Sequence, residues 1–156
     1  MKRNLHVLAA GLGAAVLVAC TPASQPPAPA PTTASASTVA DAGLTRADTQ
    51  GAVSFEVAPL NLDPTAATLD FTVVMSTHSV DLSWNLAALA TLSTDTGMQV
   101  TGASWPVNSG HHVEGTLSFP AYMGDGRKLL SGVRTLTLTI RDTDVPTRTF
   151  IWDLAR

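Results

Sequence analysis

The stretch Thr135-Leu136-Thr137-Leu138-Thr139-Ile140 alternates strictly between threonine and a large aliphatic residue. Successive side chains of a β-strand point to opposite faces, so the aliphatic residues would face a core and the threonines would face solvent. Threonine is β-branched and suits a half-exposed strand face. The stretch therefore predicts a strand with one buried face, marked by a hydrophobic period of two residues.

The same period of two recurs from Val53 to the end of the chain. Alternating segments are expected at residues 53–57, 69–75, 80–86, 113–119 and 150–154, with a hairpin over 91–100. Residues 86–90 could instead form one helical turn. Seven or eight short strands separated by turn residues predict an all-β fold, an antiparallel immunoglobulin-like β-sandwich. This part of the chain has no cysteine, so "immunoglobulin-like" describes its shape only.

Composition divides the chain into three parts. Residues 1–19 start with Lys2 and Arg3 and continue as a short apolar run, which is typical of a secretory signal peptide. Residues 20–50 are rich in Pro, Ala, Ser and Thr and lack aromatic residues, so we expect a disordered tether. Residues 51–156 carry the alternating pattern and are long enough for one core, so they are expected to form the β-sandwich domain.

The apolar run ends in Leu17-Val18-Ala19-Cys20, which resembles the bacterial lipobox. The resemblance implies that the chain is cut before Cys20, that this thiol is acylated, and that the protein is a bacterial lipoprotein held by membrane lipid. The apolar run itself is too short for a membrane span, which needs about 20 residues. Cys20 is the only cysteine, and lipidation would consume a thiol that is a liability in an oxidising compartment. The alternative is an ordinary signal peptide with a chance cysteine.

These features predict an extracytoplasmic, lipid-anchored location. Thr21, rather than Asp, follows the cysteine, and this resembles the pattern that is sorted to the outer membrane in bacteria with two membranes. The segments Thr77-His78-Ser79-Val80, Gly110-His111-His112 and Phe150-Ile151-Trp152 resemble a small domain of uncharacterised secreted bacterial proteins. That resemblance implies one domain and no particular activity.

The charge of the chain argues against nucleic acid and nucleotide as partners. The chain has 9 Lys and Arg and 12 Asp and Glu, so seven basic residues remain once Lys2 and Arg3 are removed, a net charge of −5. Binding to phosphates needs clustered Lys and Arg. No glycine-rich phosphate loop followed by a helix is present in the sequence either.

Three histidines and two methionines form a candidate metal site. The residues are His78, His111, His112, Met75 and Met123. Imidazole and thioether suit copper, and imidazole also suits zinc. Their spacing is not diagnostic, and adjacent histidines in a strand would point to opposite faces. The alternative is structural: the histidines bond the sheet edge or face solvent, and Met75 fills the core.

No pattern of a catalytic site stands out, and a hydrolase is the minor alternative. Trp105, before Pro106, lies outside the alternation, so it either lines a groove or caps one end of the sandwich. We therefore predict a membrane-tethered, non-enzymatic binding module of the cell envelope with a possible envelope-protein partner. The alternative function is copper or zinc binding at the histidines.

Overall fold

The computed structural model describes residues 43–154. The expected signal peptide, Cys20 and most of the tether lie outside the described residues and stay predictions. The elements in chain order are β1 (Arg46–Asp48), β2 (Val53–Asn61), β3 (Thr68–Thr77), α1 (Leu86–Leu89), β4 (Ala90–Thr94), β5 (Gln99–Thr101), β6 (His112–Pro120), β7 (Thr135–Thr143) and β8 (Val145–Asp153).

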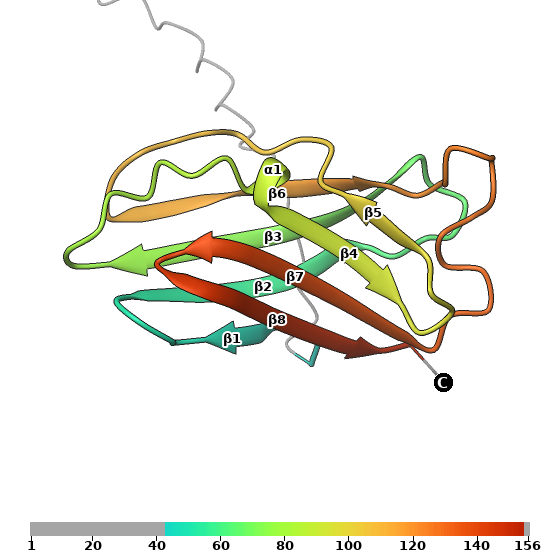
Figure 1. Cartoon of the computed structure of the whole chain (residues 1–156), viewed down its shortest axis with the longest axis horizontal. Coiled ribbons are helices and arrows are strands. Elements are labelled where there is room, and N and C mark those ends of the chain that lie inside the picture. Colours follow the sequence, from blue (N-terminus) through green and yellow to red (C-terminus); the bar gives the residue numbers. More distant parts are fainter. Residues whose placement is uncertain (1–42, 155–156) are drawn as a thin grey trace, which may run out of the picture. The chain divides into compact units, whose positions relative to one another are not determined.

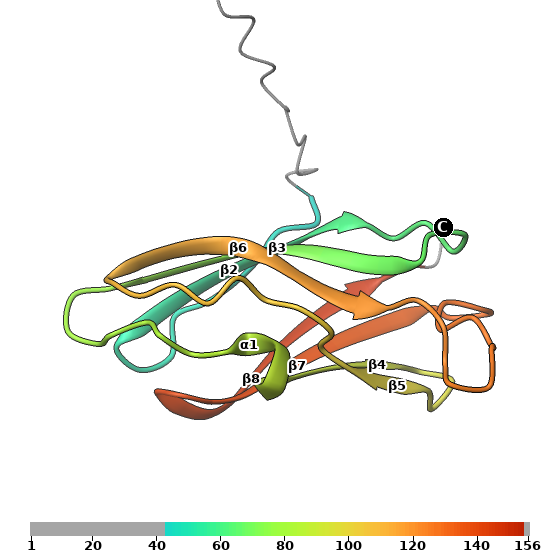
Figure 2. The same ribbon diagram turned by 90° about the horizontal axis from the view of Figure 1, so that it is seen from above.

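The strands form two antiparallel four-stranded sheets. One sheet has the order β1-β2-β3-β6, here called sheet A, and the other has the order β5-β4-β7-β8, here called sheet B. The sheets lie face to face as two layers (Figure 2). The expected all-β antiparallel sandwich of seven or eight strands is thus confirmed. The alternating stretch 135–140 lies in β7, an inner strand of sheet B.

The core lies between the sheets and follows the predicted alternation. In β3 every second side chain is buried, and those of Phe71 and Met75 are fully buried. In β7 the aliphatic residues 136, 138 and 140 are buried, and the threonines between them are partly exposed. Phe71 contacts the ring of Trp152 on β8 of the other sheet, with 5.2 Å between ring centroids. Met75 is therefore a core residue, as the structural alternative expected.

One predicted strand is absent. Residues 80–86 form no ladder, and a single helical turn, α1, begins at Leu86. Leu82 and Leu86 are fully buried, whereas Val80 and Trp84 are partly buried against the core. The apolar residues thus pack on the core as expected. They form no strand because this segment carries the chain from β3 in sheet A to β4 in sheet B (Figure 1).

The folded part begins earlier than predicted. Strand β1 lies within residues 20–50, the range assigned to the tether. It pairs with β2, with Arg46 opposite Val57 and Asp48 opposite Phe55. The alternation could not reveal this strand, because the side chains of Arg46 and Asp48 are polar and bind β8 instead of filling an apolar core.

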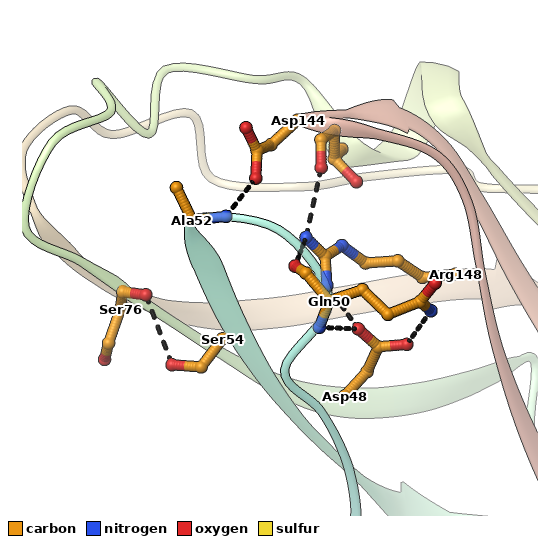
Figure 3. Close-up of polar contacts among 8 residues, drawn as sticks. Asp48, Gln50, Ala52, Ser54, Ser76, Asp144 and Arg148 are labelled. Atoms are coloured by element: carbon orange, nitrogen blue, oxygen red, sulfur yellow. Dashed lines mark hydrogen bonds and ion pairs between the residues drawn. The ribbon is translucent and has the colours of Figure 1, made fainter.

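A buried arginine joins the two sheets along this edge. The side chain of Arg148 in β8 is fully buried and forms an ion pair with Asp48 in β1. Its guanidinium also donates to the carbonyl oxygens of Gln50 at 2.8 Å and Thr143 at 3.3 Å, and it lies 4.5 Å from the ring centroid of Phe55. Figure 3 shows the guanidinium beside Asp48 and Gln50. A buried charge is tolerated when it is paired and hydrogen-bonded in this way.

Two further contacts fasten the same N-terminal segment to β8. The indole of Trp152 donates to the carbonyl oxygen of Leu44 at 2.6 Å, and the Nε of Arg46 donates to the carbonyl oxygen of Ile151 at 2.9 Å. Nearby, the Asp144 carboxylate accepts the backbone N–H of Ala52 at 2.6 Å (Figure 3). Strand β1 therefore closes one side of the sandwich by polar contacts that cross from sheet A to sheet B.

The pKa of Asp48 reflects this environment. Burial raises the pKa, but hydrogen bonds from the side chain and backbone of Gln50, together with Arg148, lower it by more. The pKa of Asp48 is therefore below its ordinary value of 3.8. A carboxyl whose pKa is lower in the folded state stabilises the fold above its unfolded pKa, and this contribution is lost as the pH falls through the folded pKa.

We expect Asp48→Asn to lower the free energy of unfolding at pH 7 by about 3 kcal/mol, because it leaves a buried guanidinium without its counter-charge. The variant should also lose less stability than the wild type between about pH 5 and pH 2, because the titrating group is gone. Urea unfolding at several pH values measures both effects.

Asp125→Asn is the matched control. It breaks an ion pair between Asp125, whose side chain is 52% exposed, and Arg127, whose side chain is 65% exposed. The unfolding midpoint should therefore stay unchanged at pH 7. Equal losses in the two variants would contradict the role given to the buried pair.

Candidate functional site

Strand β6 is a long strand at the edge of sheet A. The edge strands β1 and β5 have three residues each, whereas β6 and β8 have nine. Arg46 caps the carbonyl oxygen of Ile151 on β8, and Arg148 is an inward-pointing charge of the kind that protects sheet edges. Among residues 43–154, no arginine protects the free edge of β6 in this way, so this edge is a candidate binding surface.

Part of the β6 edge is already covered. The N–H of Ser118 donates to the carbonyl oxygen of Ser104 at 3.1 Å, and the N–H of Ala103 donates to the carbonyl oxygen of Ser118 at 2.8 Å. At the other end of β6, His111 accepts a bond from Thr77 on β3. Residues of an antiparallel strand alternate between the two sides, so even-numbered residues of β6 direct their N–H and C=O groups away from β3.

The uncovered part consists of His112, Glu114 and Thr116. By the same alternation, their backbone groups point to the free edge, and no strand lies beyond β6 in the described sheet. Their side chains are exposed on the outer face, whereas Val113 and Leu117 face the core. An unpaired edge of this kind is a template for another strand.

An open groove of about 600 Å³ lies beside this uncovered edge. One wall is the chain before β6, where the side chain of Val107 is 56% exposed. The groove is lined by Ser83, Val107, Asn108, Ser109, His112, Val113 and Glu114. Glu114 is the charged residue among them. The groove thus combines unpaired backbone groups, amide and hydroxyl side chains, and one exposed apolar side chain.

Trp105 is buried and does not line the groove. Its side chain is 8% exposed and belongs to the core cluster. A Cβ atom on Gly115 would lie 3.0 Å from the Trp105 ring and 2.7 Å from Cγ of Pro106. Only glycine leaves room for this packing, which sets where the chain runs beside β6. Trp105 was expected either to line a groove or to cap one end of the sandwich, and instead its ring is buried in the core beside Gly115 of β6.

The predicted metal ligands are only partly brought together. All three histidines lie at one end of sheet A, because Ser76 on β3 is paired with His112 and Thr77 binds the carbonyl of His111. His112 lines the groove, whereas His78 lines a separate hollow beside residues 49–54. Within residues 43–154, no three His, Cys, Asp or Glu side chains are placed to hold one metal ion.

The two methionines do not belong to this group, which corrects the prediction. Met75 is fully buried between the sheets, and its neighbour Ser76 faces outward with His112. Met123 follows the far end of β6, which is nine residues long and therefore spans roughly 26 Å at about 3.3 Å per residue (Figure 1). The described structure therefore directs the Met75 side chain into the core and leaves Met123 at the opposite end of β6 from His112.

Sequence reasoning missed the partner of His112. The hydroxyl of Ser76 lies 2.8 Å from Nδ1 of His112 across the β3–β6 pair. Ser54 in turn donates to the carbonyl oxygen of Ser76 at 3.2 Å (Figure 3). The strand register alone places these residues side by side, and no local sequence signal points to it. The contact fixes the imidazole at the rim of the groove.

Comparison with known proteins gives no relative from which to carry over a role. Protein-family models, curated proteins and solved structures all failed to give a match. Among residues 43–154, none of the helices has the length and apolar character that a membrane crossing requires.

We expect Gly115→Ala to displace the chain that forms the groove wall, because the new methyl group would overlap Pro106 and Trp105. Overpacking of this kind costs about 1–3 kcal/mol. Urea unfolding measures the loss, and the indole N–H signal of Trp105 in an NMR spectrum should shift.

Gly124→Ala is the matched control, because a Cβ atom there would meet nothing within 4 Å. A shift of the Trp105 signal in both variants, or in neither, would refute the packing role assigned to Gly115.

Proposed function

We propose that this chain is a lipid-anchored, extracytoplasmic lipoprotein whose β-sandwich is a non-enzymatic binding module of the cell envelope. The anchor rests on the lipobox-like sequence that ends at Cys20. Between Cys20 and the first described residue, Gly43, lie 22 residues rich in proline. At about 3.1 Å per residue in an extended form, they could hold the domain up to about 70 Å from the membrane.

The binding role is carried by one observation, the uncovered edge of β6 beside an open groove. A sheet edge with free backbone groups binds an extended chain by main-chain hydrogen bonds, and the flanking side chains give specificity. Val107 adds an exposed apolar contact, and Asn108 and Ser109 add polar ones. This combination suits a protein partner better than a small molecule, which would need a more enclosed pocket.

The copper or zinc alternative stays a prediction that rests on the histidines alone. Met75 is buried in the core, Met123 follows the opposite end of β6, and His78 and His112 line separate hollows. No contact in the described part of the chain favours it as a second function.

The anchor is tested by Cys20→Ser. We expect the wild type to incorporate labelled palmitate and to sediment with membranes, because acyl chains add about 0.8 kcal/mol per buried CH₂. The serine variant should do neither, whereas Thr21→Ser, which keeps the thiol, should behave as the wild type. Sedimentation of the serine variant with membranes, at the wild-type level, would count against lipid anchoring.

The binding role is tested with a photo-crosslinking residue at Asn108, in the full chain within its native envelope. Position 149 in β8, an exposed threonine on sheet B, is the control site. We expect a discrete adduct from position 108 and none from position 149, as seen by gel mobility and mass spectrometry. Identical adduct patterns from the two positions, or no adduct at 108, would refute a binding role for the groove.

A further inference from the structure

We propose that the free edge of β6 takes up an extended, lysine- or arginine-bearing segment of another envelope protein as an added strand. This inference rests on the binding role proposed above and names the chemistry of the partner. The edge fits an extended chain, because the backbone donors and acceptors of His112, Glu114 and Thr116 lie along one line. The acidic side chains around this edge favour a basic segment.

The charge distribution of the domain is strongly uneven. Residues 47–126 contain eight Asp and Glu and not a single Lys or Arg. This range includes every described strand of sheet A except the start of β1, together with both segments that flank the groove. The basic residues lie in β1 and in residues 127–156, so they belong to the rim of sheet A, the far end of the sandwich or sheet B.

Two carboxylates lie in one row across the outer face of sheet A, next to the groove. The strand register places Glu56 and Glu114 on either side of Val74. Asp81 is close to the same end, where its carboxylate accepts the N–H of Gly110 at 3.1 Å. Complementary charge mainly speeds and selects association, so these groups would favour a basic segment over a neutral or acidic one.

Two other occupants fit the edge less well. The chain's own tether, residues 21–42, carries one acidic residue and no basic one, and its prolines lack the N–H that a strand needs. A second copy pairing through β6 would bring two acidic edges together. The basic residues 127–134 of a second copy are held in place, because Leu129 is fully buried in its own core.

The structure predicts how an added strand would alter β6. Within residues 43–154, the N–H groups of His112, Glu114 and Thr116 have no backbone partner, and an added strand would hydrogen-bond them. The N–H of Ser118 is already bonded to Ser104, and Val113 belongs to the ladder with β3, so both should stay unchanged. Amide hydrogen exchange, read residue by residue by NMR, therefore reports strand addition with internal controls in the same strand.

The experiment uses the full chain carrying Cys20→Ser and a nine-residue peptide of alternating Lys and Val. The Lys side chains would face the carboxylates of the outer face, and the Val side chains would face Val107. We expect slowed exchange at His112, Glu114 and Thr116 but not at Val113 or Ser118, and no such effect from a Glu–Val peptide of the same length. Glu114→Gln should weaken binding of the Lys–Val peptide about two- to fivefold, because one exposed charge pair is lost.

Glu114→Pro is the decisive variant. It removes an N–H that the domain's own ladder does not use, so a proline is tolerated there better than at Val113. An unchanged unfolding midpoint would show that the domain is intact, and the Lys–Val peptide should then no longer protect Thr116. If proline lowers the midpoint, Glu114→Gln with the exchange readout still tests the proposal.

Several results would overturn the proposal. They are equal binding of the two peptides, protection at Thr147 and Thr149 of β8 instead, or protection of Glu114 without peptide in a concentration-dependent dimer. If the peptide fails but the crosslink at position 108 persists, the binding role stands and the partner chemistry is wrong. If the crosslink fails as well, both the binding role and the proposed partner chemistry are refuted.

Discussion

The ion pair between Arg148 and Asp48 is the constraint on which the closed side of the sandwich depends. A fully buried guanidinium must be neutralised and hydrogen-bonded, and its partners come from β1, from the turn before β2 and from the end of β7. These segments are far apart in the sequence, so the pair can form only when both sheets are in place (Figure 3). The N-terminal strand is thus part of the folded unit because a charge on the opposite sheet requires it there.

The two sides of the sandwich end in different ways. Beside β8, Arg46 and the buried Arg148 guard the edge, and the short β1 lies across from it. Beside β6, the preceding chain forms hydrogen bonds at Ser118. Beyond them, Trp105 and Pro106 pack against Gly115, and in the described part of the chain no hydrogen bond joins these two residues to the strand. That close packing keeps the groove wall in place while leaving half of the β6 edge without a partner. The edge of β6 is partly unprotected, whereas the other edge strands are short or carry protecting charges. Such an edge suits a docking surface.

Much of this architecture was predictable from the sequence, because alternation reports burial directly. Strands β2, β3, β6 and β7, the β4–β5 hairpin and the burial of Met75 follow from it. The alternation failed at residues 80–86, where apolar residues pack on the core without a strand neighbour, and at β1, whose inward side chains are polar. In both places the local structure depends on where a distant segment of the chain lies, and local alternation does not report that position. The charge asymmetry of residues 47–126 is visible in the sequence, but its meaning depends on which strands share a sheet.

The sequence by itself determined the fold class and which face of most strands is buried, and it supplied the lipobox-like motif at Cys20. Each of these depends on neighbouring residues or on a short motif, so no knowledge of the fold is needed. Tertiary structure alone decided that Ser76 contacts His112, that the methionines and histidines do not converge, and that β6 has a free edge beside a groove. These follow from strand order and register, which hydrogen bonds between distant segments establish and which no single segment encodes.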